Sequence, residues 1–215
     1  MSSARSRWLW WLVLILGLAF ALRAFRLDAV PLRGDEGFTV RYWAADPRNL
    51  VHDVRRQEPH PVGTFVAFWA WKQTAGDTEL AMRYLPLLGN LIGVAAMAGL
   101  GRRLLHSERA GLIAAALWAI NPHLIWHAQD VRNYAIWAGL SALALWLFVR
   151  AADRNRPRDW LLYAAAETLA LYTFFLEAFF VAGQALYLLL ARRDRRVLRA
   201  AVAAWALVGI LLIPL

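Results

Sequence analysis

The chain has 215 residues, and 60% of them are hydrophobic, well above the roughly 45–50% of an ordinary soluble domain. Its 24 Lys and Arg against 15 Asp and Glu give a net charge of +9, but the basic residues gather in short runs between apolar stretches. This pattern excludes a soluble domain, and it favours a membrane protein over a nucleic-acid-binding protein. The absence of cysteine excludes disulfides and thiol chemistry.

Eight apolar segments follow one another along the chain. The first, 8–22, follows Arg5 and Arg7 and is expected to be an uncleaved membrane anchor. Most of the others approach the roughly 17–20 residues that a helix needs to cross a bilayer, but 61–71 is too short. The segments after the first cover 61–71, 84–100, 110–126, 134–149, 160–175, 178–190 and 200–215.

The basic residues predict how these segments cross the membrane. If 61–71 does not cross, every Arg-rich stretch falls on one side, which the positive-inside rule identifies as the cytoplasm. We therefore expect seven spanning helices, a cytoplasmic N-terminus and a helix at 61–71 that lies along the outer membrane surface. The Arg-rich stretches are 1–7, 102–109, 150–158 and 192–199.

The predicted fold class is thus all-α, a polytopic transmembrane helical bundle in a cell (plasma or inner) membrane. The whole of 1–215 is expected to form a single module, with one large extracytoplasmic loop at 26–83 that holds more than half of the carboxylates. The last apolar segment reaches the final residue, which predicts a chain that lacks its second half.

Two adjacent carboxylates, Asp35 and Glu36, lie between Gly34 and Gly37 just after the first apolar segment. This arrangement predicts a tight turn that presents an acid at the membrane surface. A carboxylate placed beside a donor sugar can act as a general base, because it can accept the proton of an attacking hydroxyl. The alternative, two ordinary solvated acids in a turn, stays open at this point.

Further candidates lie at the same predicted face of the membrane. Glu58 and His60 could bind a divalent cation or orient a hydroxyl, although two ligands do not close a metal site. Arg83 and Arg132 lie at outer helix ends, where arginine can bind a phosphate through two hydrogen bonds or simply reach the interface. Together with the acidic loop, the two arginines suggest a site for a phospholipid headgroup and a nucleophilic hydroxyl.

Glu167 and Glu177 lie within or beside apolar segments, where an ionisable side chain is costly and usually faces the interior of a helix bundle. The sequence does not separate a structural role from a functional one for either residue. His123 and His127 are four residues apart, a spacing that can bind metal, but an interfacial polar pair is the preferred interpretation.

Several short motifs in a fixed order resemble one family. They are Arg-Leu-Asp-x-x-Pro-Leu-x-x-Asp-Glu at 26–36, Glu-Pro-His-Pro at 58–61, Met-Arg-Tyr-Leu-Pro at 82–86, Gly-Arg-Arg-Leu at 101–104, Asn-Pro at 121–122 and Gln-Asp-Val-Arg-Asn-Tyr at 129–134. This order is similar to the N-terminal half of the GT-C glycosyltransferases related to protein O-mannosyltransferases and lipid A aminoarabinose transferases. The chain departs from the pattern at Val62, where relatives often have a second proline, and at Phe174, where they often have histidine.

The resemblance implies a membrane glycosyltransferase of the cell envelope that moves a hexose or pentose from a polyprenyl-phosphate carrier to an extracytoplasmic hydroxyl, with inversion. It implies that Asp35 is the catalytic base and that Glu58 helps hold a divalent cation, if one is needed, or the acceptor. The expected partners are a polyprenyl-phosphate-linked sugar, membrane lipid and an acceptor lipid, glycan or protein. The expected substrate-binding and lipid-phosphate-binding residues are Arg83, Arg132, Glu36, Glu58, His60 and Tyr134. The alternative is a non-catalytic truncated lipid-binding component or one half of a split enzyme.

Overall fold

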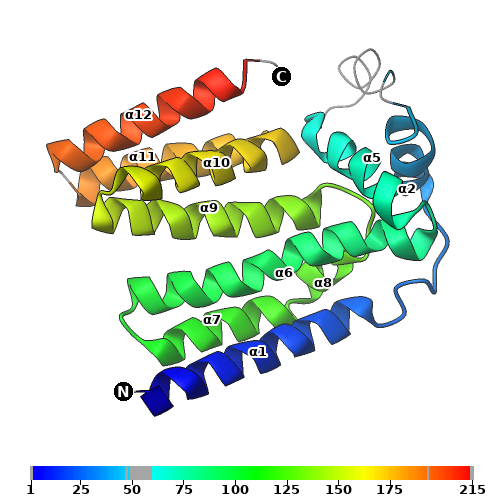
Figure 1. Ribbon diagram of the computed structural model, residues 1–215, viewed down its shortest axis with the longest axis horizontal. Coiled ribbons are helices and arrows are strands. Elements are labelled where there is room, and N and C mark those ends of the chain that lie inside the picture. The colour runs from blue at the N-terminus through cyan, green and yellow to red at the C-terminus, as the bar shows by residue number, and fades with distance from the viewer. Residues whose placement is uncertain (1, 47, 49–59, 193, 214–215) are drawn as a thin grey trace.

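A computed structural model describes residues 2–46, 48, 60–192 and 194–213, and it confirms the all-α prediction (Figure 1). Within those residues there are ten α-helices and one π-helix, and no strand. The bounds are α1 (Ser2–Ala24), α2 (Gly34–Phe38), η1 (Thr39–Trp43), α5 (Gly63–Ala75), α6 (Glu79–Leu104), α7 (Glu108–Ile120), α8 (Pro122–Ala128), α9 (Tyr134–Arg154), α10 (Pro157–Thr173), α11 (Glu177–Ala191) and α12 (Arg195–Leu211).

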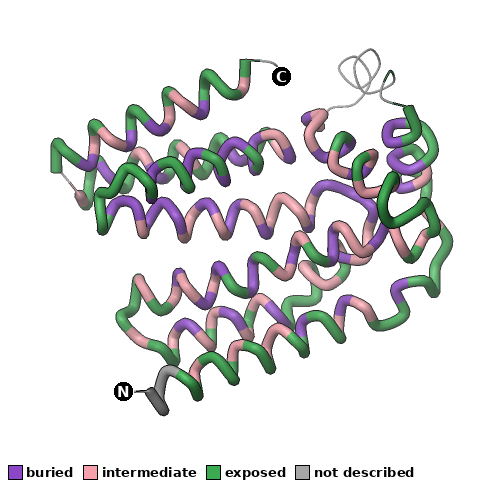
Figure 2. The backbone as a smooth tube through the Cα atoms, viewed as in Figure 1, coloured by how far each residue is buried: buried purple, intermediate pink, exposed green. Residues whose placement is uncertain are grey.

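Three helices are long and apolar enough to cross a membrane: α1 over Ser6–Ala24, α6 and α9. Large apolar side chains such as Trp10 and Trp11 of α1 and Ile210 of α12 stay exposed, which suits contact with lipid. Figure 2 colours long stretches of the outer helices as exposed or intermediate. The protein is therefore integral to a membrane. Seven crossings stay a prediction, because α7, α10, α11 and α12 have only 13 to 17 residues each.

The long helices lie side by side and bring the predicted outer and inner segments to opposite ends of the bundle (Figure 1). One end carries α2, α5 and the start of α6, and the other carries the Arg-rich turns. At the Arg-rich end Asp153 pairs with Arg103 at 2.8 Å and also with Arg192, which ties α9 to α6 and to the end of α11. The charge pattern thus separated the two ends correctly.

The central packing depends on small residues that let helices approach closely. A Cβ atom added to Gly139 of α9 would lie 1.9 Å from the carbonyl oxygen of Gly89 on α6. A Cβ atom added to Gly111 of α7 would lie 2.5 Å from the carbonyl oxygen of Ala98 on α6. Glycine at these contacts lets α6 pack directly against both neighbours, as small residues do between membrane helices.

The end of α1 is fixed by one buried charge. Arg23 is fully buried and donates to the carbonyl oxygens of Trp118 at 3.2 Å and Ala119 at 2.9 Å, at the C-terminal end of α7. Its Nε also donates to Asn90 Oδ1 of α6 at 3.0 Å. A cation that pairs with the unsatisfied carbonyls of a helix end is well stabilised. This contact fixes where the 26–83 loop leaves the bundle.

One predicted segment, 110–126, is not continuous. Helix α7 ends at Ile120, and α8 begins at Pro122 after a break at Asn121. The Asn121 side chain accepts hydrogen bonds from the amides of His123 at 3.0 Å and Leu124 at 3.2 Å. An N-cap asparagine followed by proline is a helix-start signal, and here it separates two helices within one apolar run.

Candidate active site

The segment around Asp35 and Glu36 is helical instead of the tight turn that the glycines predicted. Helix α2 begins at Gly34, and the Glu36 carboxylate accepts a hydrogen bond from the backbone amide of Arg33 at 2.9 Å. Acidic residues favour the first turn of a helix, where backbone amides are unsatisfied. The correction matters because a helical turn points neighbouring side chains in different directions.

Glu36 is buried and forms an ion pair with Arg83 from the first turns of α6. Arg83 donates to both carboxylate oxygens, from Nε and from Nη2, at 3.3 Å each. The backbone amide of Val131 also donates to Glu36 Oε1 at 3.0 Å. Glu36 therefore joins α2, α6 and the connection between α8 and α9.

The remaining donors of Arg83 bind the loop that leads into α2. They donate to the carbonyl oxygens of Leu27 at 2.9 Å, Val30 at 2.7 Å and Pro31 at 3.5 Å. The side chain is only 4% exposed. The predicted phosphate contact of Arg83 stays untested, but its guanidinium is engaged with protein groups and holds the loop in place.

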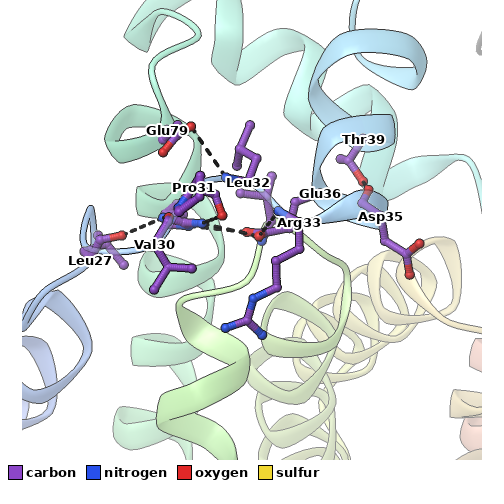
Figure 3. Close-up of polar contacts among 11 residues, drawn as sticks. Leu27, Val30, Pro31, Leu32, Arg33, Asp35, Glu36, Thr39 and Glu79 are labelled. Atoms are coloured by element: carbon purple, nitrogen blue, oxygen red, sulfur yellow. Dashed lines mark hydrogen bonds and ion pairs between the residues drawn. The ribbon is translucent and has the colours of Figure 1, made fainter.

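Asp35 is exposed, and its carboxylate points away from the Glu36–Arg83 pair (Figure 3). Its backbone carbonyl accepts a hydrogen bond from Thr39 Oγ1 at 3.0 Å, which continues the helical turn into η1. The two adjacent acids therefore differ. The carboxylate of Glu36 is engaged in contacts that hold the fold together. The carboxylate of Asp35 is exposed on the helical turn that these contacts anchor.

A second cluster forms around Arg132, which is 8% exposed and lies in the connection between α8 and α9. Its Nη2 lies 3.4 Å from His60 Nδ1, and the His60 ring stacks on Phe174 with centroids 5.4 Å apart. Tyr134 meets the His60 ring edge-on at 5.8 Å. Since arginine can only donate, His60 Nδ1 is the acceptor in this contact. The structure thus brings together three of the predicted site residues, Arg132, His60 and Tyr134.

Glu58, the other predicted metal ligand, lies outside the described residues. Among the residues that the structure does describe, no three His, Cys, Asp or Glu side chains gather as a metal site would require. His60 also directs Nδ1 at a guanidinium, which is not how a metal ligand is arranged. The described residues alone therefore do not assemble a cation site.

A small pocket of about 50 Å³ lies at the same end of the bundle, with room for only a few water molecules. Asp130, which no sequence argument singled out, lines it. Burial raises the pKa of the Asp130 carboxyl to about 6, and the nearby charge of Glu36 adds to the rise. The sequence feature that could have pointed to Asp130 is its position two residues before Arg132. The pocket is lined by Arg26, Leu27, Val30, Arg33, Glu36, Arg83, Trp126, Gln129 and Asp130.

A model of the family described as dolichyl-phosphate-mannose-protein mannosyltransferase matches residues 59–215. The matched region begins after Asp35 and Glu36, and it contains Arg83, Arg132 and Tyr134. No curated protein matches the chain. The match covers well over half of the sequence, so the chain belongs to the dolichyl-phosphate-mannose-protein mannosyltransferase family, and it is a membrane glycosyltransferase of the GT-C type.

Proposed function

We propose that this protein transfers a sugar from a polyprenyl-phosphate carrier to a hydroxyl group on the outer side of a plasma or inner membrane, with inversion at the anomeric carbon. The family match supports a donor of this chemical kind, and the family description makes mannose the first sugar to test. The acceptor hydroxyl can belong to a lipid, a glycan or a protein. The clustering of the candidate residues at one end of the bundle, opposite the Arg-rich turns, supports an extracytoplasmic site.

In the proposed reaction Asp35 acts as the general base. The acceptor oxygen forms a bond to the anomeric carbon while the bond from that carbon to the carrier phosphate oxygen breaks. The electron pair of that bond leaves with the polyprenyl phosphate, and the hydroxyl proton goes to the Asp35 carboxylate. This role suits a carboxylate that is exposed and that makes no hydrogen bond or ion pair with any described side chain.

Arg132 is proposed to stabilise the negative charge that develops on the departing phosphate, assisted by Tyr134. Preorganised donors of this kind give large rate effects because they need little rearrangement during the reaction. The Glu36–Arg83 ion pair has a different proposed role. It positions Asp35, because Glu36 is the next residue in the chain and is held by α6 and by the Val131 amide.

The observation that carries this proposal is the exposed Asp35 carboxylate on a turn anchored by a buried ion pair. The test compares Asp35→Asn with Asp28→Asn, which removes another exposed carboxylate of the same loop. Transfer is measured with polyprenyl-phosphate mannose and purified membranes. We expect Asp35→Asn to lower the rate by about 10²-fold or more, as loss of a general base does, and Asp28→Asn to leave it unchanged. An Asp35→Asn variant with a normal rate of transfer would show that Asp35 is not the general base.

A further inference from the structure

A chain of polar side chains runs through the bundle interior between α9 and α12. Glu167 of α10 and Glu177 of α11 lie at its centre, and both are fully buried. The two carboxyl groups lie within hydrogen-bonding reach of each other. Neither the sequence nor the proposed reaction explains why two acids should share one apolar interior. The other members are Trp137, Ser141, Tyr163, Gln184 and Trp205.

The direction of the hydrogen bonds on the Glu167 side follows from the indole of Trp205, which can only donate. Its Nε1 donates to Tyr163 Oη at 2.8 Å, so the Tyr163 hydroxyl hydrogen is directed onward to Gln184 Oε1. The amide nitrogen of Gln184 then donates to Glu167 Oε2 at 3.3 Å. All the hydrogen bonds of this series therefore run toward Glu167, whose Oε2 is an acceptor.

The opposite side supplies donors to Glu177 in the same way. Trp137 Nε1 donates to Glu177 Oε2 at 2.6 Å, and Ser141 Oγ donates to Glu177 Oε1 at 3.1 Å. Glu177 receives one donor on each carboxyl oxygen, whereas among the described side chains Glu167 receives only the Gln184 amide on Oε2. Glu177 thus has the features of the charged partner.

One atom of this network has no donor. Glu167 Oε1 is buried and accepts no hydrogen bond from any residue that the structure describes. Within the same residues no arginine, lysine or histidine forms an ion pair with Glu167 or Glu177. Two adjacent carboxylates without a cation would be very costly in this interior. A proton that bonds the two carboxyl groups to each other must therefore be carried by one of them.

We propose that Glu167 carries a proton on Oε1 and donates it in a hydrogen bond to the ionised carboxylate of Glu177, so that the two residues form a single proton-binding site inside the bundle. With that proton, each carboxyl oxygen of the pair takes part in a hydrogen bond. Only one negative charge remains, and it is held by Trp137, Ser141 and the Glu167 proton. The site requires side chains from α9, α10 and α11, so it fastens these helices together.

The pair also has a physical connection to the candidate active site. Trp137, which donates to Glu177, packs edge-on against Phe174 with ring centroids 5.0 Å apart. Phe174 in turn stacks on His60, the ring in contact with Arg132. Glu177 also donates its backbone amide to the Phe174 carbonyl at 3.2 Å. The pair is therefore connected to the His60–Arg132 contact through Trp137 and Phe174.

Infrared spectroscopy of the purified full chain tests the proposal, because a protonated carboxyl group has a C=O stretching band that an ionised one lacks. At about pH 7 ordinary carboxyl groups are ionised, and so is most of Asp130, whose pKa is about 6. We expect the wild-type protein to show the protonated-carboxyl band, Glu167→Gln to lose it, and Glu108→Gln, which changes an exposed acid at the other end, to retain it. A wild-type spectrum without the band, or a Glu167→Gln spectrum with it, would overturn the proposal.

Thermal stability in detergent gives a second test that does not depend on spectroscopy. Glutamine at position 167 can accept from Gln184 through its carbonyl oxygen and donate to Glu177 through its amide, as the protonated acid does. We therefore expect Glu167→Gln to keep the wild-type Tm and Glu167→Leu, which can do neither, to lower it. Equal losses in the two variants would show that a charged Glu167 is required, which contradicts the proposal.

Discussion

At the scale of single residues, the adjacent acids Asp35 and Glu36 show how the same chemical group takes two roles. Glu36 is 3% exposed and accepts hydrogen bonds from Arg33, Arg83 and Val131, whereas Asp35 projects its carboxylate from the same helical turn. Arg83 supplies the ion pair that a buried carboxylate such as Glu36 needs, since burying an unpaired charge is costly. Asp35 is thus held in place by its neighbour.

The first prediction concerns the buried ion pair. Arg83→Met leaves Glu36 charged and buried without its partner, and we expect the free energy of unfolding to fall by about 3–5 kcal/mol. Replacing both residues, as Arg83→Met with Glu36→Gln, removes the stranded charge and should recover part of that loss. Denaturation midpoints in detergent measure both effects.

The matched control for this measurement is the exposed pair of Lys72 and Asp77, whose charged atoms lie 3.5 Å apart. Asp77 is 66% exposed there, so water already stabilises its charge. Lys72→Met should change stability by less than about 1 kcal/mol. If Arg83→Met proved as mild as this control, the Glu36–Arg83 pair would not be the anchor of α2.

The second prediction concerns Asp130, whose pKa is raised from 3.8 to about 6 because of burial and, next, the charge of Glu36. The folded protein binds this proton more tightly than the unfolded chain, so stability falls as pH rises between these two values. We expect Asp130→Asn to match wild type at about pH 4 and to have a higher Tm at about pH 7. The Tm of Asp28→Asn should vary with pH as that of the wild type does. If the difference in Tm between the wild type and Asp130→Asn were the same at every pH, the prediction would be wrong.

The candidate site was predictable only in part from such residues. The sequence pointed to Asp35 through the adjacent carboxylates between two glycines, and to Arg83 and Arg132 through their place at the predicted outer helix ends. It could not show that Arg83 binds Glu36, because a long-range pair depends on where α6 lies relative to α2. Nor could it single out Asp130, whose perturbed pKa comes from burial in the folded protein.

At the scale of elements, the helices followed the apolar segments closely, and the differences occurred where local signals acted within them. The break at Asn121 and Pro122 is one case, since the N-cap hydrogen bonds start α8 inside an apolar run. Helix α12 is another: the Asp194 side chain caps it by accepting from the Arg196 amide at 2.8 Å, so the helix begins at Arg195, about five residues before the predicted apolar segment. Apolar length therefore locates a helix, and capping residues decide its ends.

The third prediction concerns the contact between α6 and α9. In Gly139→Ala the new methyl group would lie 1.9 Å from the Gly89 carbonyl oxygen, so the two helices must move apart. We expect a loss of about 1–3 kcal/mol in the free energy of unfolding, as is usual for overpacking. The control is Gly183→Ala in α11, where nothing lies within 4 Å of the added atom. Equal stability of the two variants would mean that α6 and α9 are not in close contact at Gly139.

At the scale of the whole molecule, charge divides the bundle into two ends. The Arg-rich turns between α6 and α7, between α9 and α10, and between α11 and α12 lie at one end, and the candidate site lies at the other (Figure 1). Sequence patterning predicted this division because each crossing reverses the chain and the arginines recur at every second turn. The assignment of the two ends to the inside and outside of the cell remains a prediction.

The last prediction tests that assignment with the chain's own composition. Because the protein has no cysteine, one introduced thiol reports one position without background. Asp28→Cys lies in the loop before α2, and Arg109→Cys lies at the start of α7 at the opposite end, and both native side chains are exposed. In intact cells a membrane-impermeant maleimide should label Asp28→Cys at once and Arg109→Cys only after permeabilisation, because the positive-inside rule predicts that the arginine-rich turns face the cytoplasm. The reverse order of labelling would show that Asp35 and Arg132 face the cytoplasm, and the proposed extracytoplasmic reaction would then be wrong.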